Sequence, residues 1–443
     1  MARTHRRALM RRLPDGLIVL HAAQPAHRNG DQQFRYRQDS SFLWLTGVEQ
    51  PGYALVLDAR RGEEWLFCPK LTQKHAVWLG HVPSLAEARR TFGVARAAYH
   101  DELPKTLARL ARNQKLIHAD RRSLALAHRA APRARPDRRA LEDALEELRI
   151  VKDETEVALL GKASEATARG HVAAMRAARP GLFEYEVQAE LEREFLRAGC
   201  SDVGYGSIVA SGRNSAVLHY TSNAARLEKR DLLLIDAGAE YLGYTADVTR
   251  TFPVSGRFTA RQRDLYEVVL NAQLDVIDHA RAGRTSMDLQ RRSEERLADG
   301  LRSFGLMRGG VDELVETGAI RVFFPHGIGH TLGLDVHDVH GGRRRRLPRR
   351  RAVRLKFRAR LERGFVITVE PGIYFNPALL FDAELRRKHR RRIDFAKAER
   401  CLDLGGIRIE DDVVVQASGP PSNLTRVPKS VVDVEAACNG ARA

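Results

Sequence analysis

The sequence predicts an α/β protein of two domains, and three features of the chain support this prediction. Its 443 residues exceed what one ordinary core accommodates, and 43% of them are hydrophobic, which is enough to bury two cores. In the first third, short apolar runs typical of strands alternate with amphipathic stretches typical of helices. In the remainder, an order of two helices followed by strands occurs twice.

The first domain is expected to span residues 1–140. Strands and helices should alternate there, at 17–20, 53–57, 65–67, 85–91 and 103–110. The stretch 131–136 then carries two prolines and two arginines, which is typical of a linker or of the lead-in to a helix. We therefore place the boundary near residue 140.

The second domain, 141–443, begins in a helix expected over 137–148. Asp153 with Glu156 three positions later forms a capping-box start for a long helix that ends before Pro180. The next helix, 184–198, repeats an apolar residue every fourth position. Helices over 260–282 and 287–304 and strands over 320–416 repeat this order, which indicates an internal duplication. Residues from both halves would then meet at the sheet between them.

Composition excludes several classes of protein. The net charge of +18 lies almost wholly in Arg343–Arg363, which carries +11, and Arg386–Arg392, which carries +6. Such an arginine-rich insertion favours a solvated surface over nucleic-acid binding, because only Phe357 among these arginines could stack on a base. The four cysteines form no short-spaced motif, and no apolar run is long enough for a membrane span. We expect a cytoplasmic protein.

Four short segments carry residues suited to chemistry. An apolar strand ends in Asp236, and Asp247 follows eleven positions later. Three histidines lie among glycines and apolar residues, at His326, His330 and His337. Glu370 ends a β-branched strand before a Pro-Gly turn, and alternation puts Arg408 and Glu410 on one face of another strand. Each acid taken alone is more often a charge at a strand end or one partner of an ion pair. A functional role is therefore indicated only by these acids and histidines occurring together.

Together, four carboxylates and one histidine make an oxygen-rich donor set. Such a set suits two divalent ions of the manganese, cobalt or magnesium type better than a thiolate-bound zinc. Two metals about 3.5–4 Å apart can activate water at neutral pH and polarise a carbonyl. This is the chemistry of amide hydrolysis.

These segments resemble the metal-binding motifs of the metallopeptidases with the pita-bread fold, which include methionine aminopeptidase, aminopeptidase P, prolidase and creatinase. The resemblance implies a small N-terminal α/β domain of the creatinase type before a catalytic pita-bread domain with pseudo-twofold duplication. It also implies two divalent metals per subunit, most often Mn²⁺, with Co²⁺ or Zn²⁺ as options. The family ligands fall in order on Asp236, Asp247, His330, Glu370 and Glu410.

The closer resemblance is to prolidase, the Xaa-Pro dipeptidase, and it covers nearly the whole chain. It implies that a metal-bridging hydroxide cleaves the Xaa-Pro bond and that Glu370 shuttles the proton. His337 and His219 would stabilise the tetrahedral intermediate and hold the proline side of the substrate. The pocket would also contain His326 and Tyr205, and Arg408 would orient a ligand.

The resemblance also suggests residues for substrate binding and assembly. Trp78 matches a residue that in prolidase dimers reaches the site of the partner subunit, which implies a homodimer, although a buried aromatic is an equal alternative. Prolidases carry an arginine that clamps the substrate carboxylate. Its position falls on Lys356 here, with Arg354 and Arg358 nearby, and we take Arg358 as the candidate.

Three hypotheses follow. The first is the Xaa-Pro dipeptidase acting on proline-containing dipeptides. The second is aminopeptidase P, which shares every metal ligand and acts on longer Xaa-Pro peptides. The third is a non-catalytic pita-bread binding protein, which the presence of all five ligands argues against.

Overall fold

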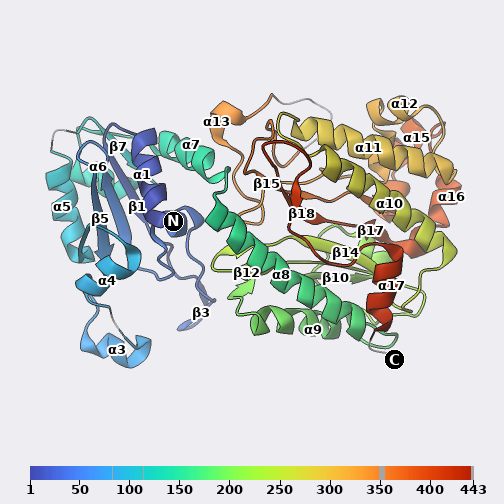
Figure 1. Cartoon of the computed structure of the whole chain (residues 1–443), viewed down its shortest axis with the longest axis horizontal. Helices are drawn as coiled ribbons and strands as arrows, with labels where there is room; N and C mark the ends of the chain where they lie inside the picture. The colour runs from blue at the N-terminus through green and yellow to red at the C-terminus, as the bar shows by residue number, and fades with distance from the viewer. Residues whose placement is uncertain (82, 113, 349–354, 441–443) are drawn as a thin grey trace. The chain divides into compact units, whose positions relative to one another are not determined.

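The computed structural model describes residues 1–81, 83–112, 114–348 and 355–440, which form two compact units. Unit 1 contains Met1–Arg149 and Gly341–Arg344, and unit 2 contains the other described residues. In each unit helices pack against β-sheets (Figure 1), which confirms the predicted two-domain α/β class. Among the described residues, every helix is too short or too polar to cross a membrane.

Unit 1 is built on a mixed six-stranded sheet of order β6-β5-β4-β1-β7-β8. Within this sheet, β1 pairs antiparallel with β4 and parallel with β7. The expected strands and helices are present, and apolar side chains such as Leu17, Val56 and Leu107 are fully buried. The strands are β1 (Leu17–His21), β4 (Ala54–Asp58), β5 (Glu63–Cys68), β6 (Arg96–Tyr99), β7 (Leu116–Ala119) and β8 (Arg135–Pro136). The helices are α1 (Ala2–Arg12), α2 (Ser40–Thr46), α3 (Gln73–Leu79), α4 (Leu85–Phe92), α5 (Leu103–Leu110), α6 (Leu124–Ala130) and α7 (Arg138–Arg149).

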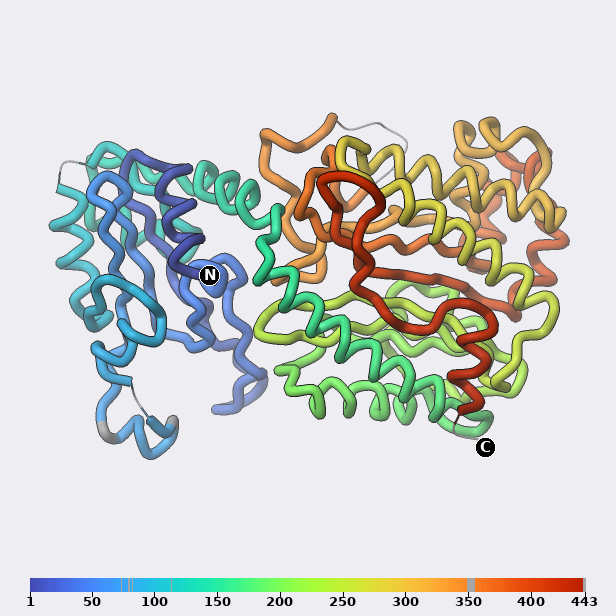
Figure 2. Tube along the Cα trace, in the orientation of Figure 1, coloured from blue at the N-terminus to red at the C-terminus, as the bar shows by residue number. Residues whose placement is uncertain are grey.

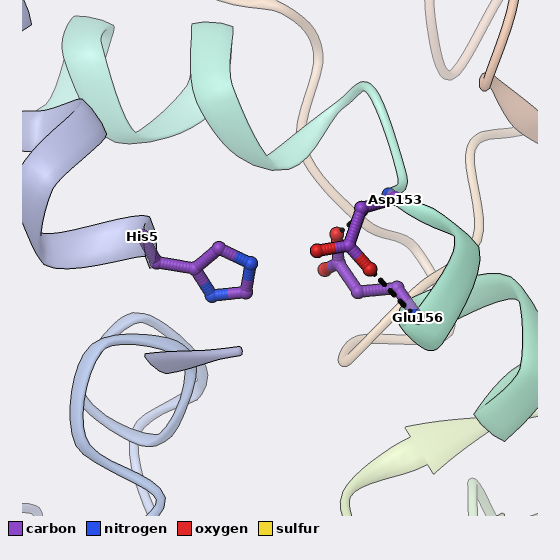
Figure 3. Close-up of side chains that lie close together, drawn as sticks. All are labelled: His5, Asp153 and Glu156. Atoms are coloured by element: carbon purple, nitrogen blue, oxygen red, sulfur yellow. Dashed lines mark hydrogen bonds between the residues drawn. The ribbon is translucent and has the colours of Figure 1, made fainter. Parts of the chain in front are cut away.

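The first half of unit 2 begins with the predicted long helix. Asp153 accepts a hydrogen bond from the backbone of Glu156, and the Glu156 side chain accepts one from the backbone of Asp153, so the capping box is confirmed (Figure 3). Two helices are followed by short strands, of which β11 pairs with β10 and β14. These elements are α8 (Glu154–Ala177), α9 (Glu184–Arg197), β9 (Asp202–Val203), β10 (Ile208–Ser211), β11 (Leu232–Ala237), β12 (Ala239–Tyr241), β13 (Tyr244–Thr245) and β14 (Val248–Pro253).

The second half repeats two helices before its strands, but the strands occupy less of 320–416 than expected. Short helices interrupt them, because Asn376 and Asp382 cap helices with their side chains and start new turns there. Most of the basic stretch Arg386–Arg392 therefore lies on a helix and the turn after it. The elements are α10 (Ala260–His279), α11 (Ser286–Ser303), α12 (Val311–Glu316), β15 (Val366–Val369), β16 (Gly372–Tyr374), α14 (Pro377–Leu380), α15 (Ala383–His389), α16 (Phe395–Glu399), β17 (Gly406–Arg408), β18 (Asp411–Val414), β19 (Ser422–Asn423) and α17 (Val431–Asn439). The short helix α13 (Gly342–Arg345) belongs to unit 1 except for its last residue.

The two halves of unit 2 meet where β14 lies beside β17 and β18. In the trace of Figure 2, the first half is green and the second half runs from yellow to red. The Glu410 amide donates to the Thr249 carbonyl over 3.0 Å, and the Thr251 hydroxyl donates to the Arg408 carbonyl over 3.0 Å. This contact of β14 with β17 and β18, which we call the seam, therefore brings together residues about 160 positions apart. One apolar core runs through both halves and surrounds it.

Candidate active site and metal centre

A cavity of about 270 Å³ opens at this seam and contains most of the residues predicted from the sequence. These are Tyr205, His219, Asp236, Asp247, His326, His330, His337, Glu370, Arg408 and Glu410. They come from both halves of unit 2, as the internal duplication suggested. The remaining predicted residues, Trp78 and Arg358, are described below.

Two strands of the first half deliver the aspartates. Asp236 lies near the end of β11, and Asp247 comes directly before β14, which pairs with β11 so that Asp236 faces Thr249. The Tyr205 hydroxyl lies 2.6 Å from Asp236 Oδ1 and 2.5 Å from Asp247 Oδ1. Its single proton can serve one carboxylate at a time, so the tyrosine bridges the pair.

The His330 ring is oriented by its own backbone. Its Nδ1 lies 3.1 Å from the Thr331 carbonyl oxygen, which can only accept, so Nδ1 carries the proton. The other nitrogen, Nε2, lies 3.2 Å from Asp247 Oδ2 and 3.9 Å from Glu370 Oε1. The histidine therefore presents a ligand nitrogen toward the carboxylates, as metal-binding imidazoles do.

The two glutamates come from the second half. Glu370 follows β15 directly, and Glu410 lies between β17 and β18. The Thr249 hydroxyl donates to Glu410 Oε2 over 2.7 Å. A threonine of the first half therefore orients a carboxylate of the second.

Arg408 links several of these groups. Its Nη2 donates to Asp236 Oδ2 over 2.5 Å, and its Nε donates to the Thr249 hydroxyl over 3.0 Å. Its Nη1 donates to the Tyr374 hydroxyl over 2.8 Å, and that hydroxyl lies 2.9 Å from His326 Nε2. Because the guanidinium is buried and fixed by three partners, it holds Asp236 directly and Glu410 through Thr249.

The carboxylates are too crowded to be stable as anions without cations. Burial, followed by repulsion from Asp247, Glu370 and Asp236, raises the pKa of Glu410 well above its ordinary value. Burial is also the main cause that raises the pKa of Glu370, to about 7. Ligand atoms of Asp247, His330 and Glu410 lie within 4.8 Å of one another. A buried set of four carboxylates and one imidazole fits two divalent cations, which would supply the missing positive charge.

His219, His337 and Lys356 also line the cavity. Burial, and then the charges of His330 and Lys356, lowers the pKa of His337 to about 4, so this ring is neutral at pH 7. Of the two candidates for the carboxylate clamp that the structure describes, Lys356 lines this cavity. Arg354 lies outside the described residues.

The expectation that Arg358 binds the substrate receives no support from its position. The chain bends at Lys356, so Lys356 enters the main cavity while Arg358 lines a separate cavity of about 260 Å³ with Arg321 and Glu294.

Trp78 lies on α3 of unit 1 and is 85% exposed, which excludes the alternative of a buried aromatic within its own unit.

Sequence reasoning assigned no role to three residues that shape this site, one of which is Tyr374, the partner of Arg408 and His326. Thr249 could have been found, because it lies two positions after Asp247 on a strand and therefore shares its face. Asp412 accepts a hydrogen bond from the Asp247 amide over 3.0 Å. Asp412 could have been found in the same way, because it lies two positions after Glu410.

Comparison with known proteins places the chain in a class. Residues 158–417 match metallopeptidase family M24, and residues 2–118 match the aminopeptidase P N-terminal domain. The chain therefore belongs to metallopeptidase family M24 and is a metallopeptidase with the pita-bread fold. Among its relatives is the Xaa-Pro aminopeptidase of Escherichia coli strain K12, 34% identical over 460 residues and matched over 99% of this chain and 97% of that protein. A probable Xaa-Pro aminopeptidase of Talaromyces marneffei is 35% identical, over 96% and 93% of the two chains.

Solved structures agree with these relatives. An Escherichia coli aminopeptidase P variant in complex with substrate is 33% identical and has a TM-score of 0.87, over 100% of this chain and 98% of that one. A zinc-substituted form of that enzyme with product has the same scores, and the Pseudomonas aeruginosa aminopeptidase PepP is 35% identical with a TM-score of 0.86. The closer resemblance to prolidase expected from the sequence is thus replaced by one to aminopeptidase P. The two groups share the metal ligands, so the ligand motifs did not separate them.

Proposed function

We propose that this chain is a metal-dependent Xaa-Pro aminopeptidase, which removes the N-terminal residue from peptides that have proline in second place. The observation that carries the proposal is the convergence of Asp236, Asp247, His330, Glu370 and Glu410 on one buried cavity. The relatives named Xaa-Pro aminopeptidase support it, because they match along nearly their whole length.

The five converging side chains would hold two divalent cations. When bound, the cations supply Lewis acidity that polarises a peptide carbonyl and makes water a nucleophile near neutral pH. Glu370 accepts a proton from the attacking water and delivers it to the leaving proline nitrogen. Arg408 and Thr249 keep Asp236 and Glu410 in place during the reaction.

The substrate side favours peptides longer than two residues. Lys356 is exposed and offers a flexible ammonium, whereas a dipeptidase needs a fixed cation that rewards a free carboxylate next to the cleaved bond. His337 is neutral and can donate one hydrogen bond to the carbonyl oxygen of the substrate. His219 lies at the same side, where the residue after the cleaved bond would bind.

The test compares Ala-Pro, Ala-Pro-Ala and longer Ala-Pro peptides with protein loaded with Mn²⁺. We expect higher kcat/KM for Ala-Pro-Ala than for Ala-Pro, and no cleavage of Ala-Ala-Ala. A preference for Ala-Pro would restore the dipeptidase hypothesis. If metal-loaded protein left every Xaa-Pro peptide intact, the non-catalytic hypothesis would replace both.

We also propose Mn²⁺ as the metal, a cytoplasmic location and a homodimer. The four cysteines, Cys68, Cys200, Cys401 and Cys438, are free and buried, which fits a reducing compartment. The exposed Trp78 would be covered by a second copy. Sedimentation of the wild-type chain and of Trp78→Ala tests the dimer, which the substitution should weaken.

A further inference from the structure

One buried carboxylate outside the metal centre gathers hydrogen bonds from both ends of a loop. Glu184, the first residue of α9, is fully buried. Its Oε1 accepts from the Ser211 amide and hydroxyl, both at 2.7 Å, and from Asn214 Nδ2 at 3.2 Å. Its Oε2 accepts from the Tyr220 hydroxyl and the Ala225 amide, both at 2.9 Å. Segment 211–225, which we call the His219 loop, is thus tied at its start and its end.

Two further residues on the same face of α9 form hydrogen bonds with this part of the chain. Gln188 and Glu192 follow Glu184 at intervals of four residues, so the three side chains share one helix face. Gln188 Oε1 accepts from Asn223 Nδ2 over 2.8 Å, and Glu192 Oε1 accepts from the Ser207 hydroxyl over 2.8 Å. Asn223 itself has a positive φ of 46°, which its hydrogen bonds help to hold.

Hydrogen bonds rather than a cation satisfy the buried carboxylate of Glu184. Within the described ranges, no arginine, lysine or histidine forms an ion pair with it. An ionised carboxylate in such a place is costly unless several donors face it, and five donors do. All five donors belong to the His219 loop. The loop conformation therefore depends on the Glu184 carboxylate, and the buried carboxylate has its donors only while the loop keeps that conformation.

His219 has no comparable attachment of its own. Its side chain is exposed, lines the active-site cavity, and has no hydrogen-bond partner in the part of the chain that the structure describes. Its place is therefore set by its backbone and by Tyr220 next to it, whose hydroxyl is held by Glu184. The loop is further tied to β17, since the Gly406 amide donates to the Ser215 hydroxyl over 2.7 Å.

We infer that Glu184 is a positioning residue for catalysis, which fixes His219 at the substrate side of the cavity by holding the two ends of its loop. The inference rests on the proposed function, because His219 matters only if a substrate binds beside it. A purely structural role would stabilise unit 2 without any specific link to His219.

The test is a double-mutant cycle between Glu184→Gln and His219→Ala, measured as kcat/KM on Ala-Pro-Ala. Glutamine keeps the size of the side chain but replaces one acceptor oxygen with an amide that cannot accept from Ala225 or Ser211. We expect Glu184→Gln to lower kcat/KM about tenfold in the wild type and less than about twofold in the His219→Ala background. Glu190→Gln, on the exposed face of α9, is the matched control and should leave kcat/KM unchanged in both backgrounds. Equal losses in both backgrounds would overturn the inference.

A second readout does not require activity. In protein labelled with ¹³C-histidine and loaded with Zn²⁺, the His219 resonance is identified by its absence from His219→Ala. We expect Glu184→Gln to shift or broaden that resonance, and Glu190→Gln to leave it unchanged. If Glu184→Gln does not fold, Tyr220→Phe removes the hydroxyl that Glu184 holds next to His219 in the sequence, and should give the same change in smaller measure. An unchanged resonance would refute the inference, whereas a changed resonance without peptide hydrolysis would refute only the proposed function.

Discussion

Replacing Lys152 with methionine should destabilise unit 2 by about 3–4 kcal/mol at pH 7. Lys152 Nζ lies 2.7 Å from Asp338 Oδ2, and both side chains are 1% exposed. Without the ammonium, the buried carboxyl group avoids its charge by taking up a proton. Keeping a proton on a carboxyl group costs about 1.36 kcal/mol for each pH unit above its ordinary pKa, which is near 3.9. At pH 7 the cost of protonating Asp338 is therefore at most about 4 kcal/mol.

Urea unfolding followed by circular dichroism, with metal removed by EDTA, measures this effect. Because the carboxyl pKa would be raised in the folded variant, the loss should be complete at high pH and shrink to about 1.5 kcal/mol at pH 5. The double variant Lys152→Met/Asp338→Asn carries no buried charge at this place and should recover at least half of the loss. A loss below about 1 kcal/mol for Lys152→Met at pH 7 would refute the reasoning.

Three further outcomes are expected. Thr249→Val should weaken metal binding about 10–100-fold by calorimetry, because Glu410 loses its orienting hydroxyl, and unchanged affinity would contradict this. Asp275→Asn should cost at most about 1 kcal/mol at pH 7 in urea unfolding, because Arg292 and Arg296 overcome the effect of burial and hold the pKa of Asp275 below its usual range. The loss should shrink at pH 2, which lies below the ordinary carboxyl pKa of about 3.9, and a loss as large as at pH 7 would contradict this. Mn²⁺ at a hundred times its Kd should stabilise the metal-free protein by about 2.7 kcal/mol, and a constant Tm would argue against a folded-state site.

Much of the site could be predicted because its residues lie at the ends of strands with strong local patterns. The apolar run before Asp236 and the β-branched run before Glu370 both form strands, β11 and β15, and each delivers its acid to the cavity. The three histidines lie in one short glycine-rich segment, so their proximity in space follows from their proximity in sequence.

Other features depend on pairing that no local pattern encodes. The attachment of Thr249 to Glu410 exists only because β14 lies beside the turn between β17 and β18. Arg358 was taken as the candidate clamp although the matching position falls on Lys356, and it is Lys356 that lines the main cavity while Arg358 lines another. Glu184 was expected only as part of a helix, since its partners follow 27 to 41 residues later.

Counting the metal ions bound per chain, before and after Asp247→Asn, tests the central claim most directly. With both glutamates, both aspartates and His330 intact, the chain should bind about two divalent ions and cleave Ala-Pro-Ala. The Asp247→Asn variant should fold, bind at most one ion tightly and lose hydrolysis. A wild-type chain that binds no divalent ion, or an Asp247→Asn variant that cleaves the peptide at the wild-type rate, would contradict the account.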